Sequence, residues 1–196
     1  GDNFMLIYSA RTGEVRAINS SGAAPRAARI DAFAGRESIP QLDPRAVTVP
    51  GCVDGWHLAL KFFGRMSLRE VLEPAIDYAE HGVPVTYRVS RAIEGWLGEL
   101  SRFPETVKRL TIDGRAPRPG EVWRQPDLAR TLREIAIGGR DAFYRGEIAR
   151  RIAAFVQELG GWLSADDLAE HRSEVLDPIS TTYRGLTVYE QPPVSQ

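Results

Sequence analysis

The residues that could bind a metal or act as a base are scattered along this chain. Its three histidines are His57, His81 and His171, and none lies in an H-E-x-x-H pattern. A zinc site requires several Cys or His ligands at short, regular spacings. The single cysteine, Cys52, cannot provide such a set. The sequence therefore predicts no metal site, and nothing in it indicates a cofactor.

No arrangement typical of nucleophilic catalysis is visible either. The chain lacks a G-x-S-x-G motif, and Asp54, His57 and the serines form no recognisable triad. The carboxylates of Asp166, Asp167 and Glu170 are better explained by the first turns of a helix, where negative charge is favourable. We therefore expect no catalytic residue within this segment.

Composition narrows the class of protein. The 196 residues carry 25 Lys and Arg against 26 Asp and Glu, and 43% of them are hydrophobic. This is the balance of a globular protein, and a formal net charge of -1 gives no bulk attraction to nucleic acid or to an anionic membrane. No run of about 18 apolar residues is present, so no transmembrane helix is predicted.

Strands are expected first along the chain. Residues 4–9 and 14–19 are β-prone runs around a short connection with Gly13, which predicts an antiparallel hairpin. The first run is almost continuously apolar, so it is expected to be buried on both faces. An irregular connection follows over residues 20–44, with a short helix near Ile30 to Phe33.

The next stretch is expected to turn from strand to helix. Ala46 to Val49 is a short β-branched run, and Pro50-Gly51 should end it. Apolar residues then recur at helical spacing from Val53 to Phe63, with Gly64 as a stop.

Helices dominate until near the C-terminus. Further apolar stripes predict helices over 68–81, 89–100, 128–136, 148–159 and 165–170, followed by strands over 179–182 and 186–190. The predicted fold class is therefore α+β and mostly helical, with one helical block flanked by strands. We expect 1–196 to be a single unit with a hairpin and loop over 1–50, helices over 51–172 and returning strands over 173–196.

Three separated motifs carry a resemblance to a known family. Residues 49–56 read VPGCVDGW, residues 139–149 read GRDAFYRGEIA, and residues 183–193 read YRGLTVYEQPP. They resemble the VPG-x-VDG-W, G-x-x-x-FY-x-G-x-IA and YRGY-x-V-x-x-x-PP segments in the large subunit of the γ-glutamyltranspeptidase family. The order of the motifs also matches.

The resemblance implies an αββα sandwich of the N-terminal nucleophile hydrolases. Members are made as a precursor that cleaves itself, and the new N-terminal threonine of the small subunit attacks the γ-glutamyl carbonyl. That threonine would lie beyond Gln196, so this chain is expected to be an internal large-subunit fragment. The small subunit of the same precursor and a small γ-glutamyl or acyl-amide substrate would be its partners. Members are often periplasmic or secreted, but this segment shows no signal peptide and leaves the compartment open.

One substrate-binding position departs from the family pattern. Typical transpeptidases carry an arginine, in a segment like D-x-R-E-x-AP, which binds the substrate α-carboxylate. Asn19, Ser20 and Ser21 begin the matching segment here, and Ser21 stands at the arginine position. A serine cannot supply the charge, so glutathione-type substrates and efficient transpeptidation come into doubt. Arg26 and Arg29 are close enough in sequence to substitute in principle.

Three functions remain open from the sequence. The parent protein could be a γ-glutamyltransferase or glutathione hydrolase-like enzyme, or a glutaryl-amide or β-lactam acylase of the same family. The third alternative is a helical interaction module with no chemistry.

Overall fold

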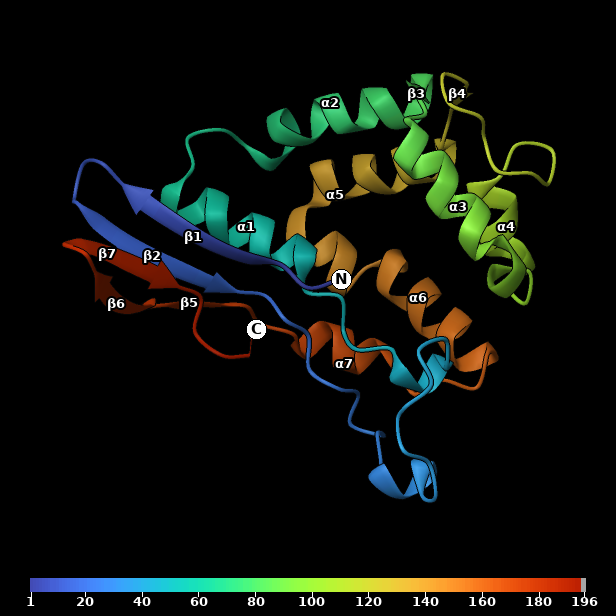
Figure 1. The fold of residues 1–196 in the computed structure, drawn as a ribbon, viewed down its shortest axis with the longest axis horizontal. Coiled ribbons are helices and arrows are strands. Elements are labelled where there is room, and N and C mark those ends of the chain that lie inside the picture. The colour runs from blue at the N-terminus through green and yellow to red at the C-terminus, as the bar shows by residue number, and fades with distance from the viewer. Residues whose placement is uncertain (195–196) are drawn as a thin grey trace. The chain divides into compact units, whose positions relative to one another are not determined.

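A computed structural model describes residues 1–194 (Figure 1). Its elements, in chain order, are β1 (Phe4–Ser9), β2 (Glu14–Asn19), the 3₁₀ turns η1 (Ile30–Phe33) and η2 (Pro44–Ala46), α1 (Cys52–Phe63), α2 (Leu68–His81), β3 (Val83–Pro84), α3 (Tyr87–Leu100), α4 (Pro104–Leu110), β4 (Val122–Trp123), α5 (Pro126–Tyr144), α6 (Glu147–Glu158), α7 (Ala165–Glu170), β5 (Glu174–Leu176), β6 (Ile179–Tyr183) and β7 (Leu186–Glu190). The predicted α+β class is confirmed, with helices in the middle of the chain and strands near both ends.

The main sheet joins the two ends of the chain. Its strand order is β1-β2-β5, and both pairings are antiparallel (Figure 1). The predicted hairpin is confirmed at its expected residues, with Phe4 opposite Asn19 and Ser9 opposite Glu14. The short strand β5, which the sequence did not predict, places Glu174 opposite Asn19. Segments about 150 residues apart therefore meet at one end of this sheet.

The prediction that β1 is buried on both faces is wrong. Phe4, Leu6 and Tyr8 are 37%, 42% and 65% exposed, while the residues between them are partly buried. Successive side chains of a strand point to opposite faces. The face that carries these three side chains is therefore the more exposed face of β1 in the described chain.

The predicted strand over Ala46 to Val49 is also wrong. Ala46 closes the turn η2, and the following residues are extended but belong to no sheet in the described chain. The Val49 N–H donates instead to the Ala23 carbonyl, at 3.1 Å. The β-branched residues favour an extended backbone, but the segment lies beside a loop and pairs with no strand in the described chain.

The predicted helix ends are largely confirmed. Helix α1 ends before Gly64 and α2 before Gly82. In α5 the helical geometry breaks at Gly139, where φ is 63° and ψ is -152°, and the chain then turns helical again as far as Tyr144. The positive φ suits glycine, which lacks a Cβ. This second short helix was not predicted, and it carries Arg140 and Tyr144.

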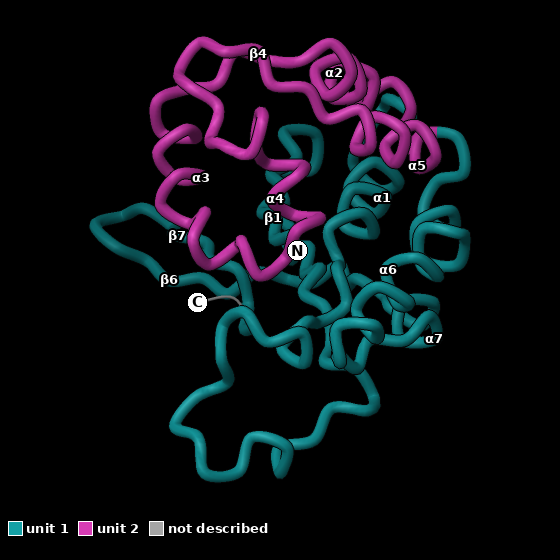
Figure 2. The backbone as a smooth tube through the Cα atoms, turned by 90° about the vertical axis from the view of Figure 1, so that its right-hand side faces the viewer, with its two compact units in different colours: residues 1–68, 137–196 teal, residues 69–136 magenta. Residues whose placement is uncertain are grey.

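The chain divides into two compact units (Figure 2). Unit 1 comprises residues 1–68 and 137–196, and unit 2 comprises residues 69–136. The buried apolar side chains of unit 1 include Ile18, Val53, Phe143, Tyr144, Ile148, Val156, Leu163 and Leu168. Those of unit 2 include Leu72, Val85, Ile93, Leu132 and Ile135. All three motifs that carry the family resemblance lie in unit 1.

Candidate substrate-binding site

The loop after β2 is held in a hydrogen-bonded turn. The Oδ1 atom of Asn19 accepts from the Ser21 N–H at 3.0 Å and from the Ser21 hydroxyl at 2.9 Å. Asparagine favours this kind of turn because its side chain can replace a backbone acceptor. The next N–H, of Gly22, donates to Asp2 Oδ1 at 3.2 Å. The Ser21 hydroxyl is therefore bonded within the turn.

A cavity of about 780 Å³ opens beside this turn. Its wall includes Asp2, Phe4, Asn19, Ser21, Gly22 and Glu174. The structure thus brings Asn19 and Ser21 together at one cavity. Its volume lies within the roughly 300–1,000 Å³ of small-molecule sites.

Ser20 lies on the other side of the turn. It is fully buried, and its Oγ atom has no hydrogen-bond partner among the described residues. Its backbone N–H and carbonyl pair with those of Asn3. Ser20 therefore supports the turn from behind and does not line the cavity.

Two glycines allow this loop to lie directly against the VPG segment. A Cβ on Gly22 would lie 1.5 Å from the Val49 carbonyl oxygen, and one on Gly51 would lie 1.9 Å from the Ser20 carbonyl oxygen. Neither distance is possible for a real side chain. The close approach of the two backbones fixes the position of the loop that carries Ser21.

A buried ion pair lies beneath this contact. The Arg140 side chain is bonded to Asp54 Oδ1 and to the His171 carbonyl. The second oxygen of Asp54 accepts from the Ser173 N–H at 2.6 Å. Since Ser173 precedes Glu174, this carboxylate links the start of α1 to the start of β5.

Tyr144 connects the same network to the VPG segment. Its hydroxyl donates to the Pro50 carbonyl at 2.7 Å and accepts from the Asp54 N–H at 3.2 Å. Its ring is stacked on His171, with 5.2 Å between ring centroids, and the Arg140 guanidinium lies 4.7 Å from its centre. The network therefore joins the VPG segment and the start of α1 to the helix after Gly139 and to the segment before β5.

Burial and hydrogen bonding set the protonation states of this network. Burial alone raises the pKa of the Asp54 carboxyl, but hydrogen bonds from Ser173 and Arg140 outweigh it and hold that pKa below its usual range. Burial lowers the pKa of His171, as do the charges of Arg140 and Arg172, while the Asp54 carboxylate opposes them. Burial raises the pKa of the Tyr144 phenol. Near neutral pH, Asp54 is thus ionised while His171 and Tyr144 are neutral.

Neither Arg26 nor Arg29, the two nearby arginines singled out from the sequence, lines the cavity beside Ser21. Arg26 forms an ion pair with Glu170, and its backbone N–H donates to Asp167 at 3.0 Å. Arg29 lines a separate cavity of about 580 Å³, together with Phe33 and Trp162. Among residues 1–194, no Lys or Arg lines the cavity beside Ser21.

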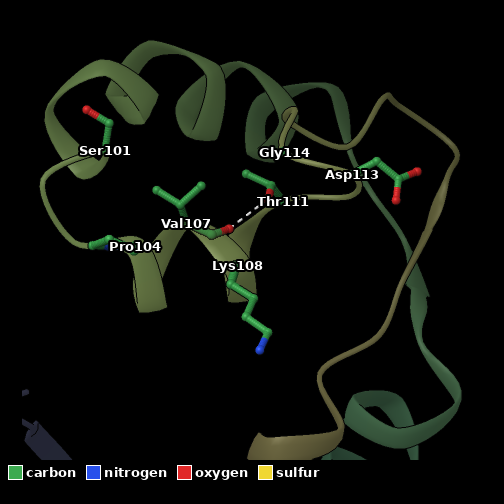
Figure 3. Close-up of a pocket in the computed structure, with 7 residues that line it drawn as sticks. All are labelled: Ser101, Pro104, Val107, Lys108, Thr111, Asp113 and Gly114. Atoms are coloured by element: carbon green, nitrogen blue, oxygen red, sulfur yellow. Dashed lines mark hydrogen bonds between the residues drawn. The ribbon is translucent and has the colours of Figure 1, made fainter.

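A further cavity, of about 460 Å³, lies in unit 2, and none of the residues singled out from the sequence line it. Lys108 and Asp113 extend from it in different directions, and the Thr111 hydroxyl is bonded to the Val107 carbonyl (Figure 3). Among residues 1–194, no three His, Cys, Asp or Glu side chains are grouped so as to hold a metal ion. No helix in that range is long and apolar enough to cross a membrane.

Four residues of this region were not identified from the sequence. Asp2 and Glu174 reach the cavity through pairing at the end of the sheet, which local patterns do not show. Arg140 and His171 lie beside Asp54 in the structure, although they are 86 and 117 positions away from it in the sequence. The only available signal was that Asp54, Arg140 and Tyr144 fall inside the motifs.

Comparisons with known proteins place this chain in a family. The sequence model of the family described as Gamma-glutamyltranspeptidase matches residues 1–196. The chain is 42% identical over 197 residues to the glutathione hydrolase-like YwrD proenzyme of Bacillus subtilis, and 39% identical over 202 residues to the oxamate amidohydrolase proenzyme of Klebsiella pneumoniae. Each match covers 100% of this chain and 38% of the relative.

A solved structure shows the same fold. The cephalosporin acylase from Bacillus halodurans matches with a TM-score of 0.89 and 37% identity, over 98% of this chain and 38% of that one. The present chain thus spans about two fifths of the length of these proteins. Since the family model covers every residue of the sequence, this chain belongs to the gamma-glutamyltranspeptidase family.

Proposed function

We propose that this chain is the large-subunit part of a self-cleaving precursor that hydrolyses or transfers an acyl group from an amide. The observation that carries the proposal is the family match over all 196 residues. The relatives named above are proenzymes of a glutathione hydrolase-like protein and an amidohydrolase. The N-terminal threonine of a small subunit would be the nucleophile, as the family resemblance implies.

In this proposal the chain supplies one wall of the acyl-binding site. Asn19 and Ser21 would face the acyl group, because both line the cavity. The family resemblance, which implies a carboxylate-binding segment here, supports this placement. Ser20 would hold the turn from behind. The small subunit of the same precursor would complete the site and cover the exposed face of β1.

A second function, that of an acylase, is favoured by one specific observation. The family resemblance implies an arginine at the position of Ser21, and the Ser21 hydroxyl is bonded to Asn19. Without that charge, an α-carboxylate has no partner on this wall.

Expression of the complete precursor tests the proposal. We expect purified protein to separate into two polypeptides on a denaturing gel and to release p-nitroaniline from at least one acyl p-nitroanilide. Replacement of the threonine at the cleavage junction by alanine should abolish both cleavage and turnover. A complete precursor that stays in one piece and releases no amine from any acyl amide would contradict the proposed function.

A further inference from the structure

The cavity beside Ser21 carries negative charge on its wall. Asp2 lies just before β1, and Glu174 begins β5 opposite Asn19. Asp2 accepts one hydrogen bond, from the Gly22 N–H. The Glu174 side chain has no hydrogen bond or ion pair among residues 1–194. Both carboxylates are exposed and remain available to a bound molecule.

The neighbouring arginines are bound elsewhere. Arg16 pairs with Asp177 at 2.6 Å, and Arg26 pairs with Glu170. Arg172, two positions before Glu174, donates to the carbonyls of Ala169 and His171. The described part of the chain therefore brings two carboxylates and no cation to this cavity.

The uncharged groups on the cavity wall do not offset the negative charge of Asp2 and Glu174. The Ser21 hydroxyl donates to Asn19 Oδ1, so it is not free to donate to an incoming carboxylate. Two like charges repel by an amount that depends on their separation and on the solvent between them. A carboxylate placed here would meet Asp2 and Glu174 without a compensating partner, whereas an ammonium group would be attracted.

Building on the proposed function, we propose that Asp2 and Glu174 determine which acyl group this site accepts. Acyl chains that end in an ammonium or an uncharged group bind, and chains that end in a carboxylate are rejected. The substrate class is therefore an amide of an amino-acyl or neutral acyl chain, and γ-glutamyl and glutaryl amides are poor substrates.

Three p-nitroanilides of matched length test this specificity in the complete, self-cleaved protein. Glutaryl, pentanoyl and 4-aminobutyryl chains place a carboxylate, a methyl and an ammonium group at nearly the same distance from the amide. We expect kcat/KM to be highest for 4-aminobutyryl and lowest for glutaryl. The double variant Asp2→Asn, Glu174→Gln should raise the glutaryl-to-pentanoyl ratio of kcat/KM by about four- to twenty-fold, because repulsion across a partly aqueous gap is of that order.

Glu14→Gln is the matched control. It removes the same kind of charge at the opposite end of β2, five residues from Asn19, or about 16 Å along a strand. That separation exceeds the Debye length of about 8 Å at physiological salt, so the ratio should stay within about two-fold of the parent. The two carboxamide variants keep the size of the side chains, and Asn at position 2 can still accept from Gly22.

The outcomes separate this inference from the proposed function. Turnover that favours glutaryl over pentanoyl, or a ratio unmoved by the double variant, would overturn the specificity but leave the acyl-amide reaction intact. Absence of turnover with all three anilides would contradict the specificity, because two of them are its named substrates. The proposed function would be contradicted only if, in addition, the precursor failed to cleave itself and turned over no other acyl amide.

Discussion

At the scale of single residues, Ser21 and His171 have separate roles. Ser21 lies at the cavity, with its hydroxyl bonded to Asn19. His171 lies beneath the loop, stacked on Tyr144 and 3.8 Å from the Asp54 carboxylate. A change at Ser21 should therefore alter substrate preference, whereas a change at His171 should alter stability.

Ser21→Arg should restore binding of carboxylate-bearing acyl groups. A charge-assisted bidentate bond is worth roughly 1.5–3 kcal/mol, or about a ten- to hundred-fold change in binding. We expect KM for glutaryl p-nitroanilide to fall relative to pentanoyl p-nitroanilide, measured in the complete protein. Ser180→Arg, on the exposed strand β6, adds the same charge away from the cavity and should leave the ratio unchanged. Equal ratios in the two variants would show that Ser21 does not face the substrate.

His171→Gln should reduce the pH dependence of folding stability. Because the folded state lowers the pKa of His171, the unfolded chain takes up a proton first as pH falls. Its contribution to stability is thus present above the ordinary pKa of 6.5 and is lost as pH falls below that value. A tenfold difference in proton affinity between the folded and unfolded chain corresponds to about 1.4 kcal/mol of folding free energy. Urea unfolding between pH 7 and pH 5 should show a shallower fall for the variant, and identical slopes would contradict the prediction.

At the scale of elements, the predicted structure was most accurate where local patterns determine it. The β1–β2 hairpin and helices α1, α2 and α6 follow from apolar periodicity and from glycine stops. The exposed face of β1 could not be predicted, because it depends on what covers the strand. The Val47–Val49 segment looked like a strand because its β-branched residues favour an extended backbone, whether or not a ladder forms.

The candidate site was only partly predictable, because some of its residues meet through contacts between distant parts of the sequence. The family resemblance singled out Asn19 and Ser21, and both line the cavity. Their role in substrate binding stays a prediction. Asp2 and Glu174 come from opposite ends of the chain, and only the β2–β5 register brings Glu174 beside Asn19. The helix after Gly139 was not predicted, because the helical apolar stripe was expected to end at residue 136.

The contact between the loop and the VPG segment should not tolerate a side chain. Gly51→Ala places a Cβ 1.9 Å from the Ser20 carbonyl oxygen, so the backbones must separate. Overpacking of this kind typically costs about 1–3 kcal/mol. Gly95→Ala is the control, because this position in α3 has no atom within 4 Å of a new Cβ, and alanine should stabilise the helix by about 0.5–1 kcal/mol. Chemical denaturation should give changes of opposite sign, and a neutral Gly51→Ala would contradict the described contact.

At the scale of the whole molecule, the chain is one part of a larger enzyme in our proposal. It covers 38% of the length of the two relatives named above, and its described residues hold a cavity and a buried network. The hydroxyls of Ser20 and Ser21 are, respectively, buried and bonded within the turn. This chain would therefore position and select the acyl group, and the small subunit would attack it.

Mapping the acyl-enzyme intermediate tests this division of roles most directly. The complete, self-cleaved protein is mixed with an acyl p-nitroanilide that it turns over and is quenched in acid within one turnover. Peptide mass spectrometry then locates the acyl group. We predict that the adduct lies outside residues 1–196, on the N-terminal residue of the small subunit. An acyl adduct on Ser20, Ser21 or any other residue of this chain, lost together with turnover when that residue is replaced by alanine, would contradict the account.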